Sequence, residues 1–84
     1  MTVTTSRGTA YEPEWIDGPT ITSGQVLMRL ATDRPLGELA AELDGLAWIR
    51  REDEQQGNKE WNTTRLAGIY RDGDKVTVSF ALEG

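Results

Sequence analysis

The chain has 84 residues, with 14 acidic and nine basic side chains, a formal net charge of −5, and neither cysteine nor histidine. A chain of this length forms one domain with a thin core. The composition excludes disulfides, thiolate metal sites and catalysis through Cys or His, and the negative charge opposes general binding to nucleic acid or anionic membranes.

The N-terminal segment, residues 1–20, shows neither helical nor strand periodicity and is rich in Thr, Ser, Gly and Pro. We expect a flexible or partly docked tail there, followed by a single domain over residues 21–84. Tyr11, Trp15 and Ile16 interrupt this tail, and two interpretations stay open for them. They either fold back onto the core or act as a linear motif that docks on a partner.

The first predicted helix covers residues 23–32. Thr22 and Gln25 have the spacing of a capping box, in which a hydroxyl and an amide satisfy free backbone N–H groups. The apolar residues that follow recur at helical spacing and would form one buried face: Val26, Leu27, Leu30 and Ala31.

A second helix is predicted to begin near Pro35 and to end before Gly45. Pro suits the first turn of a helix and Gly suits the position after its end. The apolar residues between them follow an i, i+3, i+4, i+7 pattern: Leu36, Leu39, Ala40 and Leu43.

The C-terminal segment predicts a β-hairpin. Residues 66–71 and 75–82 are rich in strand-forming side chains, and Asp72-Gly73-Asp74 lies between them. An Asp-Gly pair tolerates the positive φ angles of a tight turn. Alternation of apolar and small polar side chains from Val76 to Leu82 gives the last strand one buried face.

Residues 46–61 leave two interpretations open. If residues 46–51 form a strand, the fold is α+β, with two short helices packed on a three-stranded antiparallel β-meander. If residues 46–56 instead form a helix, three helices precede a β-hairpin, which is the winged-helix order. We take the meander as the primary prediction because Trp48 and Ile49 favour a strand.

The second interpretation rests on a resemblance. Residues 35–43 resemble the first helix of a helix-turn-helix pair, and the resemblance implies that the next helix, with Arg50 and Arg51, enters the major groove of DNA. The acidic run over residues 52–54 opposes this function, because carboxylates next to phosphates work against counterion release. DNA binding by a transcriptional regulator is therefore the alternative function, and we expect nucleic acid not to be the partner.

No motif predicts an enzyme, a cofactor or a metal site. Three consecutive carboxylates at residues 52–54 cannot converge on one cation from a strand, because neighbouring side chains point to opposite faces. The serines have no histidine to activate them. The glycines match no phosphate-binding pattern.

We therefore expect a small, non-enzymatic protein–protein interaction module, such as a regulator, adaptor or inhibitor of a larger bacterial or phage machine. Arginine outnumbers lysine by seven to two, a bias often associated with GC-rich bacterial coding sequences. The expected partner is another protein or a second copy in a homo-oligomer. No membrane partner is expected, and the absence of an apolar segment at residues 1–7 predicts a cytoplasmic protein without a signal peptide. The residues expected to bind are Tyr11, Trp15, Ile16, Arg50, Arg51 and Trp61.

Overall fold

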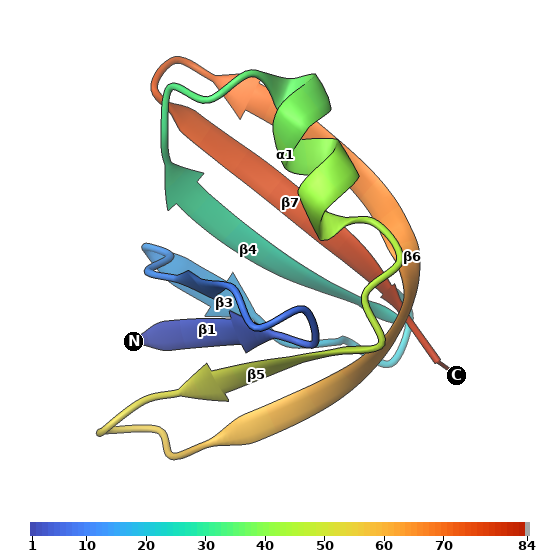
Figure 1. The fold of residues 1–84 in the computed structure, drawn as a ribbon. Coiled ribbons are helices and arrows are strands. Elements are labelled where there is room, and N and C mark those ends of the chain that lie inside the picture. The colour runs from blue at the N-terminus through green and yellow to red at the C-terminus, as the bar shows by residue number, and fades with distance from the viewer. Residues whose placement is uncertain (84) are drawn as a thin grey trace.

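Seven strands in one antiparallel sheet and a single short helix make up the computed structural model, which describes residues 1–83 (Figure 1). The elements in chain order are β1 Thr2–Thr5, β2 Ala10–Tyr11, β3 Trp15–Asp17, β4 Gln25–Ala31, α1 Leu36–Leu43, β5 Trp48–Glu52, β6 Lys59–Asp72 and β7 Lys75–Leu82. Across the sheet the strand order is β2-β1-β5-β6-β7-β4-β3. The predicted fold of two helices on a three-stranded meander is therefore wrong.

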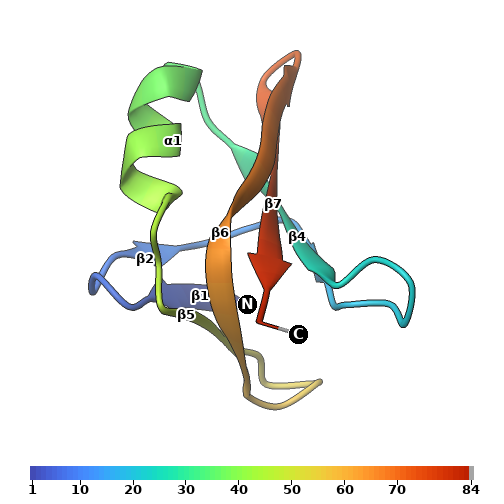
Figure 2. The same ribbon diagram turned by 90° about the vertical axis from the view of Figure 1, so that its right-hand side faces the viewer.

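Strand β6 is 14 residues long and links the two halves of the sheet. Its first part, residues 59–62, pairs with β5, and the remainder pairs with β7. Two register shifts, between Thr63 and Arg65 and between Leu66 and Gly68, insert extra residues into β6. Such bulges bend a strand and increase its twist. The sheet consequently curves strongly along β6, and its halves face each other (Figures 1 and 2).

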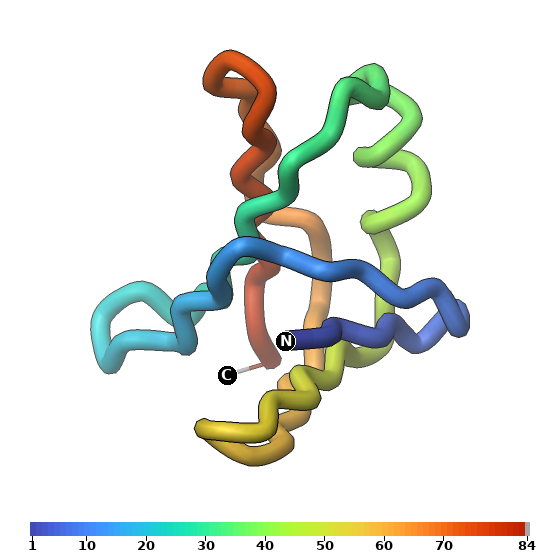
Figure 3. The backbone as a smooth tube through the Cα atoms, turned by 90° about the vertical axis from the view of Figure 1, so that its left-hand side faces the viewer, coloured from blue at the N-terminus to red at the C-terminus, as the bar shows by residue number. Residues whose placement is uncertain are grey.

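The two edge strands, β2 and β3, follow each other in the chain although they lie at opposite ends of the sheet order. Residues 12–14 connect them, so the chain crosses directly from one half of the curved sheet to the other (Figure 3). Glu14 donates its backbone N–H to the Arg29 carbonyl at 2.8 Å, and Pro13 is buried. The connection therefore adds one more backbone hydrogen bond to β4, directly before the pairing of β3 with β4 begins.

The core lies on the concave inner face of the sheet. Side chains at alternating positions of β4 and β7 point into it, and α1 adds Leu39 and Leu43 from above (Figure 1). The buried apolar residues are Val3, Val26, Met28, Leu30, Leu39, Leu43, Leu46, Ile49, Trp61, Val76, Val78 and Phe80. No second layer is present on the convex outer face among the described residues (Figure 2).

The helix predicted over residues 23–32 is wrong, because this segment contains β4. Val26, Met28 and Leu30 alternate along it and are 0 to 5 % exposed, which is the period of a strand. The apolar residues of this segment fit a helical period as well as a strand period. The segment is a strand because it pairs with β7 along its whole length. Thr22 belongs to the turn before β4 and caps no helix.

The helix after Pro35 and the C-terminal hairpin are confirmed. Helix α1 ends before Gly45, whose φ of +73° is the left-handed conformation expected there. In the hairpin, Asp72 pairs with Lys75, so Gly73, with a φ of +63°, and Asp74 form the turn. The winged-helix order is wrong, because it needs a helix where β5 lies. DNA binding through that helix loses its structural basis.

Residues 1–20, where the composition predicts a tail, form β1, β2 and β3. Val3 and Thr5 are buried, and β1 pairs with β5 over four residues. The segment lacks visible strand periodicity because each of its strands spans only two to four residues. These strands are nevertheless part of the sheet and cover one side of its core.

Candidate functional site

A row of four side chains crosses the outer face of β3, β4, β7 and β6. The members, here called the outer row, are Trp15, Arg29, Thr77 and Tyr70, and each directly faces the next across a strand pair. The strand period places them on the face opposite the core, since their chain neighbours Met28, Val76 and Val78 are fully buried. An aromatic side chain therefore lies at each end of the outer row, with an arginine between them.

The outer row is closely packed although solvent covers this face. Thr77 in the middle is only 6 % exposed, while Tyr70 at the end is 59 % exposed. Trp15 is half-buried. A small threonine on an uncovered sheet face becomes this inaccessible only when larger neighbours lie over it. Arg29 and Tyr70 flank Thr77 on the two neighbouring strands, and the Nε of Arg29 is itself enclosed.

The charge of Arg29 is only weakly compensated. Its Nε lies 3.8 Å from a Glu14 carboxylate oxygen, too far for a hydrogen bond. The other carboxylate oxygen of Glu14 accepts a hydrogen bond from Lys75. Arg29 Nε is enclosed and has no hydrogen-bond partner among residues 1–83. The outer row thus contains a guanidinium group whose donors are not saturated within the described chain.

A second aromatic–arginine pair lies on the outer face of the other half of the sheet. The Arg50 guanidinium stacks 4.6 Å from the centre of the Trp48 ring and donates to Glu60 at 2.7 and 3.0 Å. Trp48 faces Asn62 across the strands, whereas Trp61 faces Ile49. The two tryptophans therefore lie on opposite faces of the sheet. Arg50 is already neutralised, which leaves this pair less to offer a partner than the outer row.

Arg51 and Trp61 lie together on the inner face, away from Arg50. The Arg51 guanidinium carbon is 5.6 Å from the centre of the Trp61 ring, and the Lys59 ammonium nitrogen is 5.3 Å from it. Trp61 is only 6 % exposed and belongs to the core. These two predicted residues share a location with each other, but not with Trp15.

Tyr11 and Ile16 both contact other parts of the fold. The Tyr11 hydroxyl donates to the Glu42 carboxylate on α1, and Arg34 donates to the same carboxylate at 2.6 Å. The Arg34 hydrogen bond, followed by that from Tyr11, holds the pKa of Glu42 below its ordinary value, and burial raises the pKa of Tyr11. This network ties the helix to β2. Ile16 is half-buried and packs against the core.

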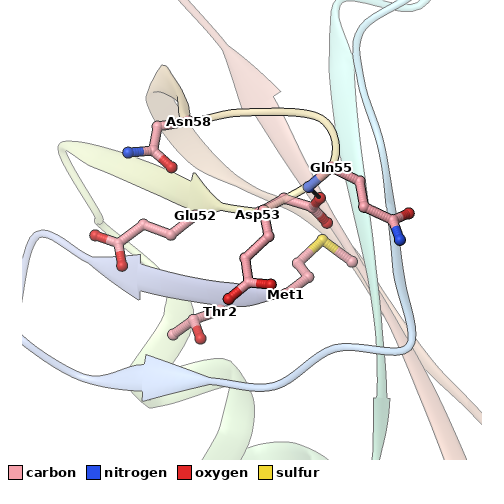
Figure 4. A pocket seen from close by; sticks show the side chains of 7 residues that line it. Met1, Thr2, Glu52, Asp53, Gln55 and Asn58 are labelled. Atoms are coloured by element: carbon pink, nitrogen blue, oxygen red, sulfur yellow. Dashed lines mark hydrogen bonds between the residues drawn. The ribbon is translucent and has the colours of Figure 1, made fainter.

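An acidic depression of about 600 Å³ lies at the β5–β6 loop. Its lining residues are Met1, Thr2, Glu52, Asp53, Glu54, Gln55 and Asn58 (Figure 4). Asp53 accepts the backbone N–H groups of Gln55 and Gln56 at 2.8 Å each, and these bonds hold the pKa of Asp53 below its ordinary value. Its carboxylate therefore stabilises the turn. Residues 1–83 contain no group of acidic side chains arranged to hold a metal ion.

Sequence reasoning identified Trp15 but missed its companions. Arg29 lies in the segment predicted to be a helix, outside its apolar face, and neither Arg29 nor Tyr70 was predicted to bind. A strand period of two over residues 25–31 would have placed Arg29 on the face of the sheet opposite to that of Met28. The alignment of Tyr70 with Arg29 could not be read from the chain, because it depends on the register of three strand pairs.

The chain matches no known family model, and no curated protein and no solved structure is significantly similar to it. The part of the chain that the structure describes has no helix of the length and apolar character needed to cross a membrane.

Proposed function

We propose that this chain is a small, non-enzymatic protein-binding module that contacts another protein through the outer row. A role as a regulator, adaptor or inhibitor follows from this mode of action, since a module of this kind acts by occupying a surface of its partner. The observation that carries the proposal is the alignment of Trp15, Arg29 and Tyr70, with Thr77 between the last two, on a sheet face that no other element of residues 1–83 covers (Figure 2).

The residue types support protein contact. Tryptophan, tyrosine and arginine dominate the energetics of protein–protein interfaces, because each offers a large contact area together with a hydrogen-bonding group. The exposed hydroxyl end of Tyr70 and the incompletely satisfied guanidinium group of Arg29 supply such groups here. A partner carbonyl or carboxylate would complete the hydrogen bonding of Arg29.

The packing of the outer row supports the proposal as well. Association costs conformational entropy when side chains become ordered at an interface. The Nε of Arg29 is already enclosed in the free chain, and Thr77 next to it is only 6 % exposed. Less of the interaction energy is therefore offset by the entropy lost in ordering side chains than at an interface of mobile side chains.

The electrostatics favour a protein over the other macromolecules considered. The net charge of −5 repels nucleic acid and anionic membranes over a distance of several ångströms. Near the outer row lie two basic residues, Arg29 and Lys75, and two acidic residues, Glu14 and Asp17. Such a mixed surface suits a protein partner with charges of both signs.

The test compares variants in a capture experiment. Tagged protein is incubated with a lysate of the cells that encode it, captured proteins are quantified by mass spectrometry, and the affinity of the purified candidate is measured by calorimetry. Because a hot-spot residue contributes 2 kcal/mol or more, we expect Tyr70→Ser and Arg29→Ser to weaken binding by at least about tenfold. Trp48→Ser is the matched control, because it removes an aromatic side chain from the same face of the other half of the sheet.

Two results would overturn the proposal. One is binding that Trp48→Ser weakens as much as Tyr70→Ser does. The other is the failure of the folded, monomeric chain to retain any specific protein. Circular dichroism and thermal unfolding of each variant establish that the variant is folded.

A further inference from the structure

Two neighbouring cross-strand pairs of β5 and β6 differ sharply in how their charges are balanced. Arg50 faces Glu60, and the two form an ion pair of 2.7 Å on the outer face. At the next position Arg51 faces Lys59 on the inner face. Like charges directly opposite each other destabilise a sheet, so this pair requires an explanation that the first does not.

No carboxylate of residues 1–83 forms an ion pair with Arg51 or Lys59. Asp53 is close enough for Arg51 to lower its pKa slightly, but the stronger causes are the N–H groups of Gln56 and Gln55. The Asp53 oxygen that accepts those N–H groups already serves the turn.

Unsatisfied hydrogen-bond donors lie at the same place. Both cationic groups lie over Trp61, at 5.6 and 5.3 Å from the ring centre. Trp61 is only 6 % exposed, its ring edge lies against Gly18, and its indole N–H has no hydrogen-bond partner among residues 1–83. The Nε of Arg51 is also enclosed and has no partner in the same part of the chain. Each such unsatisfied buried donor costs about 1–3 kcal/mol.

We infer that Arg51, Lys59 and Trp61 form a binding site for an oxyanion, either a carboxylate or a phosphate. Such a group carries several acceptor oxygens, so one anion can accept hydrogen bonds from the Arg51 guanidinium while it neutralises Lys59, beside the Trp61 ring that both cationic groups approach. This site lies on the inner face of β5 and β6 and is independent of the outer row. The inference therefore goes beyond the proposed protein contact.

The surroundings limit which anions can bind. Glu52, Asp53 and Glu54 follow Arg51 directly in the chain and line the acidic depression next to it (Figure 4). Their charge repels polyanions such as duplex nucleic acid. A single small oxyanion meets the two cationic groups without extending along the acidic loop.

Nuclear magnetic resonance tests the site directly, because the three tryptophans give three indole N–H signals and Trp61→Phe identifies that of Trp61. The probes are inorganic phosphate, sodium acetate and a capped tri-aspartate peptide, each added at constant ionic strength. We expect a saturable shift of the Trp61 signal with at least one probe. Phosphate alone would identify a phosphate site, acetate a carboxylate site, and the peptide alone a carboxylate that belongs to a protein.

Substitutions on the two faces provide the control. Because charge-assisted hydrogen bonds are lost, Arg51→Gln and Lys59→Gln are each expected to weaken binding by about tenfold. Arg50→Gln removes the same charge one residue away on the other face and is expected to leave the affinity unchanged. Lys59 is exposed, so its variant tests the site even if Arg51→Gln fails to fold. The absence of a saturable shift with all three probes, or an equal effect of Arg50→Gln, overturns the inference.

Discussion

Met28 and Leu27 are adjacent in β4 but point to opposite faces of the sheet, so truncating each to alanine tests the fold directly. Met28 is 0 % exposed in the core, whereas Leu27 is half-buried on the outer face. In a helix over residues 23–32 the order would be reversed, because Leu27 would belong to the buried stripe with Val26 and Leu30. The pair therefore discriminates between the two conformations of this segment.

The magnitudes follow from burial. Replacing a fully buried methionine by alanine costs about 2–5 kcal/mol, from lost transfer energy and the cavity left behind. The half-buried Leu27 leaves no enclosed cavity, and its truncation should cost about 1 kcal/mol. At roughly 0.05–0.15 kcal/mol per residue, a chain of this size has a total stability of about 4–13 kcal/mol. Met28→Ala is consequently expected to lower Tm by at least about 10 °C.

Urea unfolding followed by circular dichroism measures both variants against the parent chain, with the midpoint and slope fitted separately. A larger loss for Leu27→Ala than for Met28→Ala would refute the reasoning, since no strand in the observed register produces it.

Three further predictions concern the helix and the hairpin turn. Tyr11→Phe should lower the free energy of unfolding by about 1 kcal/mol, measured by urea unfolding, because it removes the hydrogen bond to Glu42 from a partly exposed site. Folding lowers the pKa of Glu42 below its ordinary value of 4.5, so the ionised Glu42 carboxylate stabilises the folded protein above pH 4.5, and this stabilisation is lost as the pH falls. The difference in unfolding free energy between the parent chain and Glu42→Gln should therefore shrink on acidification. A difference that grows would contradict this. Gly73→Ala should destabilise the folded protein by about 1 kcal/mol, because residue 73 has a φ of +63° in the turn. Gly37→Ala should instead stabilise it by a similar amount, because residue 37 lies in helix α1 and its added methyl group would meet open space. Equal effects of the two substitutions on Tm would count against the turn geometry.

The candidate site was only partly predictable. Trp15 could be singled out because an aromatic residue in an irregular, polar segment is unusual. Its partners could not, since Arg29, Thr77 and Tyr70 come from strands that are far apart in the chain and meet only through the sheet register. The opposite placement of Arg50 and Arg51 followed from β5 being a strand, but which of the two meets Glu60 depended on its pairing with β6.

Local signals in the chain were sufficient for α1 and for the β6–β7 turn. Pro35 and Gly45 delimit the helix, and Gly73 supplies the positive φ of the turn, so the backbone preferences of single residues already determine these features. The conformation of residues 25–31 was decided by tertiary structure instead. Their apolar pattern fits both periods, and only pairing with β7 on one side and β3 on the other satisfies their backbone groups as a strand. Nonlocal pairing likewise made strands of residues 1–17 and curved the sheet along β6, because the hydrogen bonds of a sheet join residues that are distant in the sequence.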